Sequence, residues 1–63
     1  MKFVGTVIFA KRQGGALGSP SVTDIRLDGR IEKHDVLLEI SVPTSRAGAY
    51  PVGRRVVLWI KPV

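Results

Sequence analysis

Hydrophobic and polar residues alternate along much of this chain with a period of two, which is typical of half-buried β-strands. The alternation is clearest over residues 36–42, whose even-numbered positions are all apolar: Val36, Leu38, Ile40 and Val42. Glu39 and Ser41 lie on the opposite, polar face, where Leu37 is the exception. Residues 22–27 alternate in the same way, with Ile25 and Leu27 on one side. Both segments are therefore predicted to be strands with one face in a core.

The two ends of the chain also read as strands. Residues 2–12 are rich in Val, Ile, Phe and Thr, and one face would carry Phe3, Gly5, Val7 and Phe9. We expect Phe3 and Phe9 to lie in the core. We expect Gly5 to mark a bulge or a sharp coil in this long strand. Residues 54–61 place Val56, Leu58 and Ile60 on one face, and on the other face Arg55, Val57, Trp59 and Lys61.

Turn-forming residues separate these strands. Asp28-Gly29 predicts a hairpin whose three-residue loop, residues 27–29, sets Ile25 opposite Ile31. Thr44 or Ser45 is a candidate N-cap for about one helical turn over residues 44–50. Residues 13–21 contain three glycines and a proline without either period, and are predicted to be a loop.

Four or five strands, one short helical turn near residues 44–50 and no long helix predict an all-β fold. We expect a single small barrel or a strongly curled antiparallel sheet, SH3-like or OB-like, formed by residues 1–63 as one domain. A chain of 63 residues buries little of its surface, so its core is thin. Assembly into a homo-oligomer would relieve this shortage.

Charge favours an anionic partner. The chain has ten Lys and Arg against five Asp and Glu, a net charge of +5, and no cysteine. Its isoelectric point near 10.5 points to nucleic acid, phosphate or anionic lipid. No run approaches the roughly 20 apolar residues that span a bilayer, and no signal peptide is recognisable. A cytoplasmic protein that does not enter the membrane is the expectation.

Catalytic groups are sparse. The single histidine, His34, precedes Asp35, but neighbours on a turn rarely form a base and its orienting partner. Glu32 would add only a weak oxygen-rich cluster, without a recognised spacing of metal ligands. We therefore expect a protein that is not an enzyme, with no metal and no cofactor.

The most informative feature is the second face of the last strand, where the only tryptophan lies between basic residues. Bases would stack on Trp59 while Arg55 and Lys61 hold the backbone. Alternatively, Val57 and Trp59 join another copy of the chain or a protein target, or a strand twist places Trp59 in the core. Further candidate phosphate contacts are the basic residues Arg26, Arg30, Lys33 and Arg54.

The glycine-rich loop at residues 13–21 is a second, weaker candidate for anion binding through backbone amides. It lacks the ending of a P-loop, and no helix follows it. A plain connector between two strands is the competing interpretation.

Two resemblances accompany this pattern. The closing segment, residues 52–62, resembles the last strand of TOBE barrels in molybdate-binding proteins and transporter ATPases, which implies oxyanion binding between subunits. The whole layout is similar to short proteins of phages and prophages, which share an opening Gly5-Thr6-Val7 strand and a closing Val52-Gly53-Arg54-Arg55-Val56 strand. This second likeness implies a compact accessory protein that acts by binding. The combined expectation is a small basic module that contacts nucleic acid.

Overall fold

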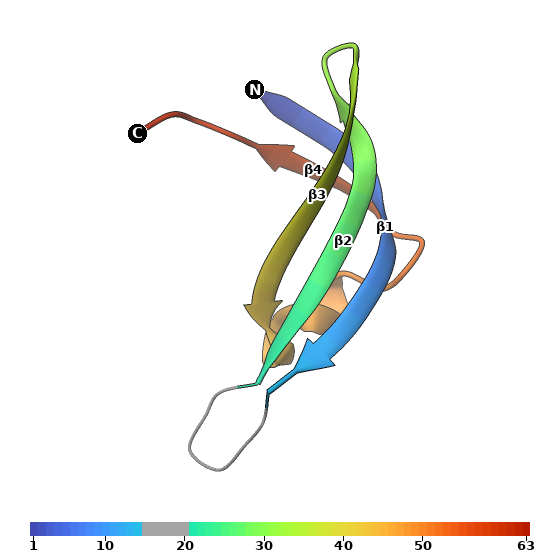
Figure 1. Cartoon of the computed structure of the whole chain (residues 1–63), viewed down its shortest axis with the longest axis vertical. Helices are drawn as coiled ribbons and strands as arrows, with labels where there is room; N and C mark the ends of the chain where they lie inside the picture. Colours follow the sequence, from blue (N-terminus) through green and yellow to red (C-terminus); the bar gives the residue numbers. More distant parts are fainter. Residues whose placement is uncertain (15–20) are drawn as a thin grey trace.

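The computed structural model describes residues 1–14 and 21–63 and is built from four antiparallel strands (Figure 1). In chain order these elements are β1 (Lys2–Gln13), β2 (Val22–Ile31), β3 (His34–Pro43), the 3₁₀ helix η1 (Thr44–Ala49) and β4 (Arg55–Trp59). The strands form one sheet in the order β3-β2-β1-β4. The predicted all-β fold with one short helical turn is confirmed.

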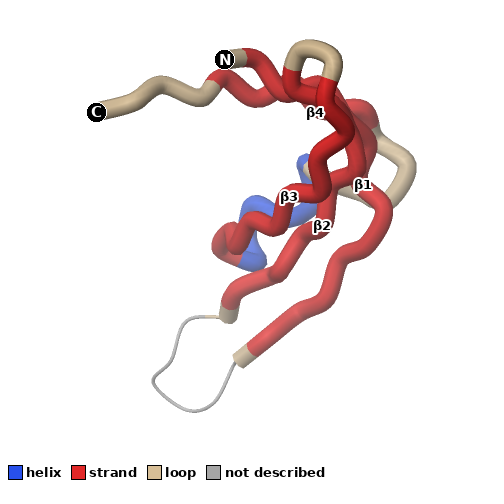
Figure 2. Tube along the Cα trace, turned by 45° about the horizontal axis from the view of Figure 1, so that its top comes forward, coloured by secondary structure: helices blue, strands red, loops and turns tan. Residues whose placement is uncertain are grey.

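The sheet is curved but open (Figure 2). β3 and β4 lie at its two edges, and each is paired with one neighbour, β2 and β1 respectively. The described residues therefore form no closed barrel. η1 and the turn after it carry the chain from the β3 edge to the β4 edge.

One face of the sheet, called here the inner face, holds the core. Four side chains on β1 and β2 are fully buried there: Phe3, Val7, Ile25 and Leu27. Around them pack partly buried residues from β2, β3, β4 and the end of η1: Ile31, Val36, Leu38, Ile40, Val42, Tyr50, Val56, Leu58 and Ile60. The core stripes predicted on the second, third and last strands are confirmed. The opposite side is called the outer face.

β1 changes faces part-way along its length. Val7 pairs with Leu27, but the next pair is Phe9 with Arg26, so Ile8 is an extra residue in the strand. This bulge moves Phe9 to the outer face, where it is 43% exposed. The prediction that Phe9 lies in the core was wrong. The bulge lies at Ile8 and not at Gly5, where a bulge or a sharp coil was predicted.

Gly5 and Gly29 are directly paired on neighbouring strands beneath the ring of Phe3. A Cβ on Gly5 would stand 2.6 Å from the Phe3 ring. A Cβ on Gly29 would meet the Val4 carbonyl oxygen and would stand 2.5 Å from the Gly5 Cα. Phe3 therefore covers the backbone at a site where β1 and β2 approach too closely for side chains.

The predicted turn at Asp28-Gly29 was wrong, because both residues lie inside β2. The chain turns four residues later, at Glu32-Lys33, and pairs Ile31 with His34. Ile25 therefore faces Ile40 and not Ile31. Glu32 has a φ of 55°, a conformation that suits glycine far better than glutamate.

Hydroxyl groups anchor η1 to the sheet. The Thr44 hydroxyl shares hydrogen bonds with Ser21 Oγ at 2.8 Å and with Oγ1 of the buried Thr23 at 3.0 Å. No side chain caps η1, so the predicted N-cap at Thr44 or Ser45 was wrong. Thr44 instead provides a hydrogen-bond partner for a hydroxyl that would otherwise be buried alone.

A tight turn leads into β4. Arg54 N donates to the Pro51 carbonyl oxygen at 3.0 Å, and Gly53 has a φ of +95°. Gly53 N and the Arg54 carbonyl oxygen both bond to Val7, which aligns β4 beside β1. β4 ends at Trp59, two residues before the predicted end at Lys61, although Ile60 N still donates to the Met1 carbonyl oxygen.

Within the described residues, no helix has the length and apolar character needed to cross a membrane.

Candidate nucleic-acid interface

Trp59 lies on the outer face of β4 and is 72% exposed. Its position follows from the alternation of β4, because Val56, Leu58 and Ile60 pack against the core. Val57, two residues away on the same face, is 53% exposed. The core interpretation of Trp59 is therefore wrong, and the tryptophan indole is accessible to a binding partner.

Basic side chains surround Trp59. Lys2 is its partner on β1, and the Lys2 Nζ lies 5.7 Å from the centre of the indole ring. Arg55 lies on the same outer face, opposite Thr6. These side chains, with Val4 between them, form a surface called here the Trp59 face: Lys2, Val4, Thr6, Arg55, Val57 and Trp59.

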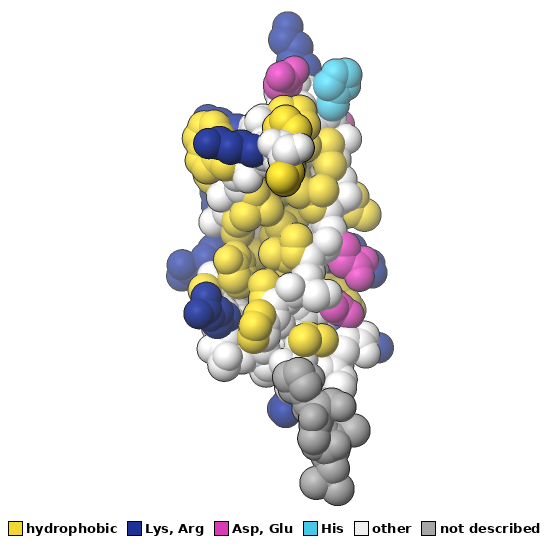
Figure 3. All heavy atoms as spheres, turned by 90° about the vertical axis from the view of Figure 1, so that its left-hand side faces the viewer, with side chains coloured by type: hydrophobic (Ala, Val, Ile, Leu, Met, Phe, Trp, Pro, Cys, Tyr) yellow, Lys and Arg dark blue, Asp and Glu magenta, His cyan; other side chains and the backbone are white. Residues whose placement is uncertain are grey.

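The Trp59 face contains no acidic side chain, because neither of its strands has one. Residues 1–14 and 54–63 carry six basic residues and no aspartate or glutamate. All five acidic residues lie between positions 24 and 39, on β2, β3 and the turn between them. Figure 3 shows basic side chains mainly along one side of an apolar stripe and acidic ones mainly along the other.

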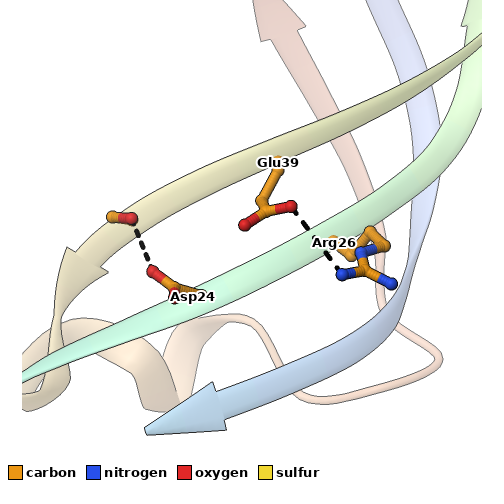
Figure 4. A network of polar contacts seen from close by, with 4 residues as sticks. Asp24, Arg26 and Glu39 are labelled. Atoms are coloured by element: carbon orange, nitrogen blue, oxygen red, sulfur yellow. Dashed lines mark hydrogen bonds and ion pairs between the residues drawn. The ribbon is translucent and has the colours of Figure 1, made fainter. Parts of the chain in front are cut away.

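On β2 and β3 three outward-facing carboxylates have polar partners, two of which Figure 4 shows, whereas the exposed Asp28 lies opposite Thr6 at the border of the Trp59 face. Arg26 Nη2 lies 3.8 Å from Glu39 Oε2, and its guanidinium also stacks 5.1 Å from the centre of the Phe9 ring. Ser41 Oγ donates to Asp24 Oδ1 at 2.6 Å. Arg30 Nε donates to Asp35 Oδ1 at 2.8 Å.

The predicted contact residues fall into three groups: those on or beside the Trp59 face, those in ion pairs on β2, and Lys33 in the turn after β2. Arg55, Val57 and Trp59 are brought together on one face, with Arg54 at its start and Lys61 just beyond β4, both exposed. Arg26 and Arg30 stand in ion pairs on β2. Lys33 is exposed in the turn between β2 and β3.

Sequence reasoning missed Lys2 as a member of this surface. The missing signal was the pairing of the first strand with the last, which sets Lys2 opposite Trp59. The prediction that Phe9 is core also hid its contact with Arg26.

The residues considered for catalysis do not converge. His34 and Asp35 are neighbours in β3 and so point to opposite faces. The Asp35 carboxylate accepts its hydrogen bond from Arg30. Across residues 1–14 and 21–63, no three His, Asp or Glu side chains group closely enough to hold a metal ion.

Comparisons with protein-family models, curated proteins and solved structures return no match to this chain.

Proposed function

We propose that this protein is a binding module, not an enzyme, and that it contacts single-stranded nucleic acid through the Trp59 face. The observation that carries the proposal is an exposed tryptophan with Lys2 Nζ 5.7 Å from its ring, on two strands that carry no acidic residue. An aromatic ring stacks on bases, and cations beside it neutralise phosphates.

Single strands are favoured over duplex by the shape of the surface. Unpaired bases expose their ring faces, and an exposed indole on a sheet can stack on them without insertion into a helix. Lys2 lies beside the indole on the paired strand, and Arg55 lies four residues away along β4 on the same face. The two cations could therefore contact phosphates of neighbouring nucleotides. Arg54 and Lys61 extend the same basic surface at both ends of β4.

Arg26 and Arg30 contribute less in this proposal. Their guanidinium groups already face the carboxylates of Glu39 and Asp35. A phosphate arriving there would have to compete with a carboxylate, whereas at Arg55 it meets no acidic neighbour on the paired strand.

A second candidate function uses the same surface, because exposed Val57 and Trp59 also suit a protein contact. In this version the protein is structural or inhibitory, and it joins another copy or docks on a protein target. Self-association through this face would bring Lys2 and Arg55 of two copies close together, which opposes it electrostatically. An acidic protein target would meet no such repulsion.

The small-anion hypothesis places a ligand between subunits or at the loop of residues 13–21. Of that loop, residues 15–20 lie outside the described residues. The basic Trp59 face on β1 and β4 provides a better defined anion-binding surface, so nucleic acid is preferred.

The test is a titration with fluorescently labelled single-stranded oligonucleotide, followed by anisotropy at several salt concentrations. Affinity should fall steeply as salt rises. Trp59→Ala should weaken binding by about 1–3 kcal/mol, the contribution of one stacked base.

A matched pair of charge reversals separates a defined face from general attraction. Arg55→Glu changes the Trp59 face, and Arg46→Glu makes the same change in net charge on η1. Arg55→Glu should weaken binding at least about tenfold more than Arg46→Glu. Equal losses would mean that net charge alone attracts the oligonucleotide, and a Trp59→Ala variant that binds normally would contradict stacking.

A further inference from the structure

The two edges of the sheet are protected very differently. Exposed edge strands present unpaired backbone groups, and proteins usually blunt them with short length, proline or charged side chains, lysine above all. β4 is only five residues long, follows Arg54 directly and is followed three residues later by Pro62. β3 is ten residues long; between His34 and Pro43 its only charged residues are Asp35 and Glu39, and it contains no proline, lysine or arginine.

The hydrogen-bonding pattern shows which β3 groups face outward. Thr44 N donates to the Ser21 carbonyl oxygen across the β2–β3 pair. Because residues of an antiparallel strand point their backbone groups alternately to either side, even-numbered residues of β3 bond to β2. The amides and carbonyls of the odd-numbered residues therefore face the open edge: Asp35, Leu37, Glu39 and Ser41.

The side chains along this edge are incompletely covered on both faces. Leu37 on the outer face is 62% exposed. On the inner face, Val36, Leu38, Ile40 and Val42 pack against the core but remain partly exposed. A strand added beside β3 would cover apolar side chains on both faces and satisfy the outward amides.

We propose that a second copy of this chain adds that strand, so that β3 pairs antiparallel with β3 of its partner across a two-fold axis at Leu38. The sequence of β3 is self-complementary in this register. On the inner face Leu38 meets its own copy and Val36 meets Ile40. On the outer face Leu37 meets Glu39, and Asp35 meets Ser41.

Charge disfavours the two adjacent registers. An axis at Leu37 would set Asp35 opposite Glu39, and an axis at Glu39 would set that carboxylate opposite itself. Like charges directly opposite each other destabilise a strand pair. The axis at Leu38 avoids both of these directly opposed pairs. It brings the two exposed Leu37 side chains, and likewise the two Glu39 side chains, to diagonal positions about 7–8 Å apart.

The dimer joins the two sheets into one of eight strands. It uses a surface separate from the Trp59 face, which lies on the strands farthest from the new junction. A two-fold axis perpendicular to the sheet leaves both Trp59 faces on the same side. The proposal concerns assembly alone and stands whether or not the protein binds nucleic acid.

The test is sedimentation equilibrium of the purified chain without nucleic acid, over a wide range of concentration. The wild type should be in a monomer–dimer equilibrium. Leu37→Glu should raise the dimer dissociation constant by about tenfold or more, because two pairs of carboxylates then face each other. Val57→Glu, the same change on the outer face of the other edge strand, should leave the dimer intact.

A charge swap tests the register. Adding Glu39→Lys to Leu37→Glu should restore the dimer, because each glutamate then faces a lysine. A monomeric wild type, a dimer insensitive to Leu37→Glu, or a dimer broken by Val57→Glu and not by Leu37→Glu would each overturn the proposal.

Hydrogen exchange on the wild type provides a measurement that needs no variant. The amides of Leu37 and Glu39 should become protected as protein concentration rises, because they bond across the junction. Exchange of these amides that is fast and independent of concentration would overturn the proposal, even if Leu37→Glu failed to fold.

Discussion

The β2–β3 hairpin and the β1–β4 pair differ in their charged residues: the hairpin carries both signs and forms ion pairs, whereas the charged residues of β1 and β4 are all basic. The hairpin holds all five acidic residues of the chain, and its outward-facing arginines stand beside carboxylates. β1 and β4 carry basic residues only, together with the exposed Trp59. A net charge of +5 spread evenly would make a weakly attractive surface, whereas this segregation leaves the Trp59 face with two basic side chains, Lys2 and Arg55, and no acidic one.

The two halves also differ in what their outward apolar residues can do. Val57 and Trp59 lie among cations, which suits an anionic partner with flat apolar groups. Leu37 lies on an unprotected edge near Glu39, which suits a neighbouring strand. Similar exposure on two strands therefore leads to two different proposed partners.

The largest expected effect is on the free energy of unfolding, and it comes from the pairing of β1 with β2, where the two halves of the sheet meet. Gly29→Ala would push a methyl group into the β1 backbone and the Phe3 ring, so it should lower the free energy of unfolding by about 2–3 kcal/mol. Gly48→Ala is the matched control, because its added methyl would contact nothing within 4 Å. Urea denaturation followed by circular dichroism measures both. Equal stability of the two variants would show that the strands can separate at Gly5 and Gly29.

The next effect sharpens the contrast in charge. Arg55→Gln and Arg30→Gln each remove one positive charge, the first from the Trp59 face and the second from an ion pair on β2. Arg55→Gln should lower the slope of log affinity against log salt by about 0.7, the value for one phosphate contact on a single strand. Arg30→Gln should leave the slope unchanged. If Arg30→Gln lowered the slope as much, the hairpin would share in binding.

The smallest effect lies at the tip of the hairpin. Glu32 adopts a φ of 55°, so Glu32→Gly should raise the free energy of unfolding by about 0.5–1 kcal/mol. Oligonucleotide affinity should not change, because the turn lies outside the Trp59 face. Thermal unfolding measures the change in stability, and the anisotropy titration measures the oligonucleotide affinity. A destabilised Glu32→Gly would mean that the glutamate side chain, and not the backbone, matters at this turn.

Alternation predicted the strands well where one face is apolar without interruption. β3 is the clearest case, and even its exception, Leu37, is found exposed on the outer face. The last strand was equally readable, since Val56 and Leu58 face the core. In both strands a period of two decides the face, and nothing downstream changes it.

Alternation failed where the backbone departs from a regular ladder. The bulge at Ile8 reverses the faces of β1 after Val7, and a bulge leaves no mark in a sequence of residues apolar on both faces. Asp28-Gly29 has the composition of a turn, but Gly29 is needed for close approach to Gly5, and the turn falls on Glu32-Lys33 instead. The sequence thus identified Gly29 as structurally important, but it assigned the glycine to a turn and not to the close contact between two strands.

The sequence predicted the part of the candidate interface that lies on β4, but not the part contributed by β1. Arg55, Val57 and Trp59 were grouped correctly because they share one strand. Lys2 could not be added without the pairing of β1 with β4, which joins the two ends of the chain. The ion pairs of Arg26 and Arg30 likewise depend on a register that the sequence alone misplaced.

The central claim is that the β1–β4 half binds nucleic acid and the hairpin does not. An NMR titration of labelled protein with a single-stranded oligonucleotide tests it residue by residue. We expect shifts of the backbone amide signals at residues 2–6 and 55–61 and of the Trp59 indole signal, with the signals of residues 22–43 nearly unchanged. Shifts centred on residues 22–43, or none at any salt concentration, would contradict it.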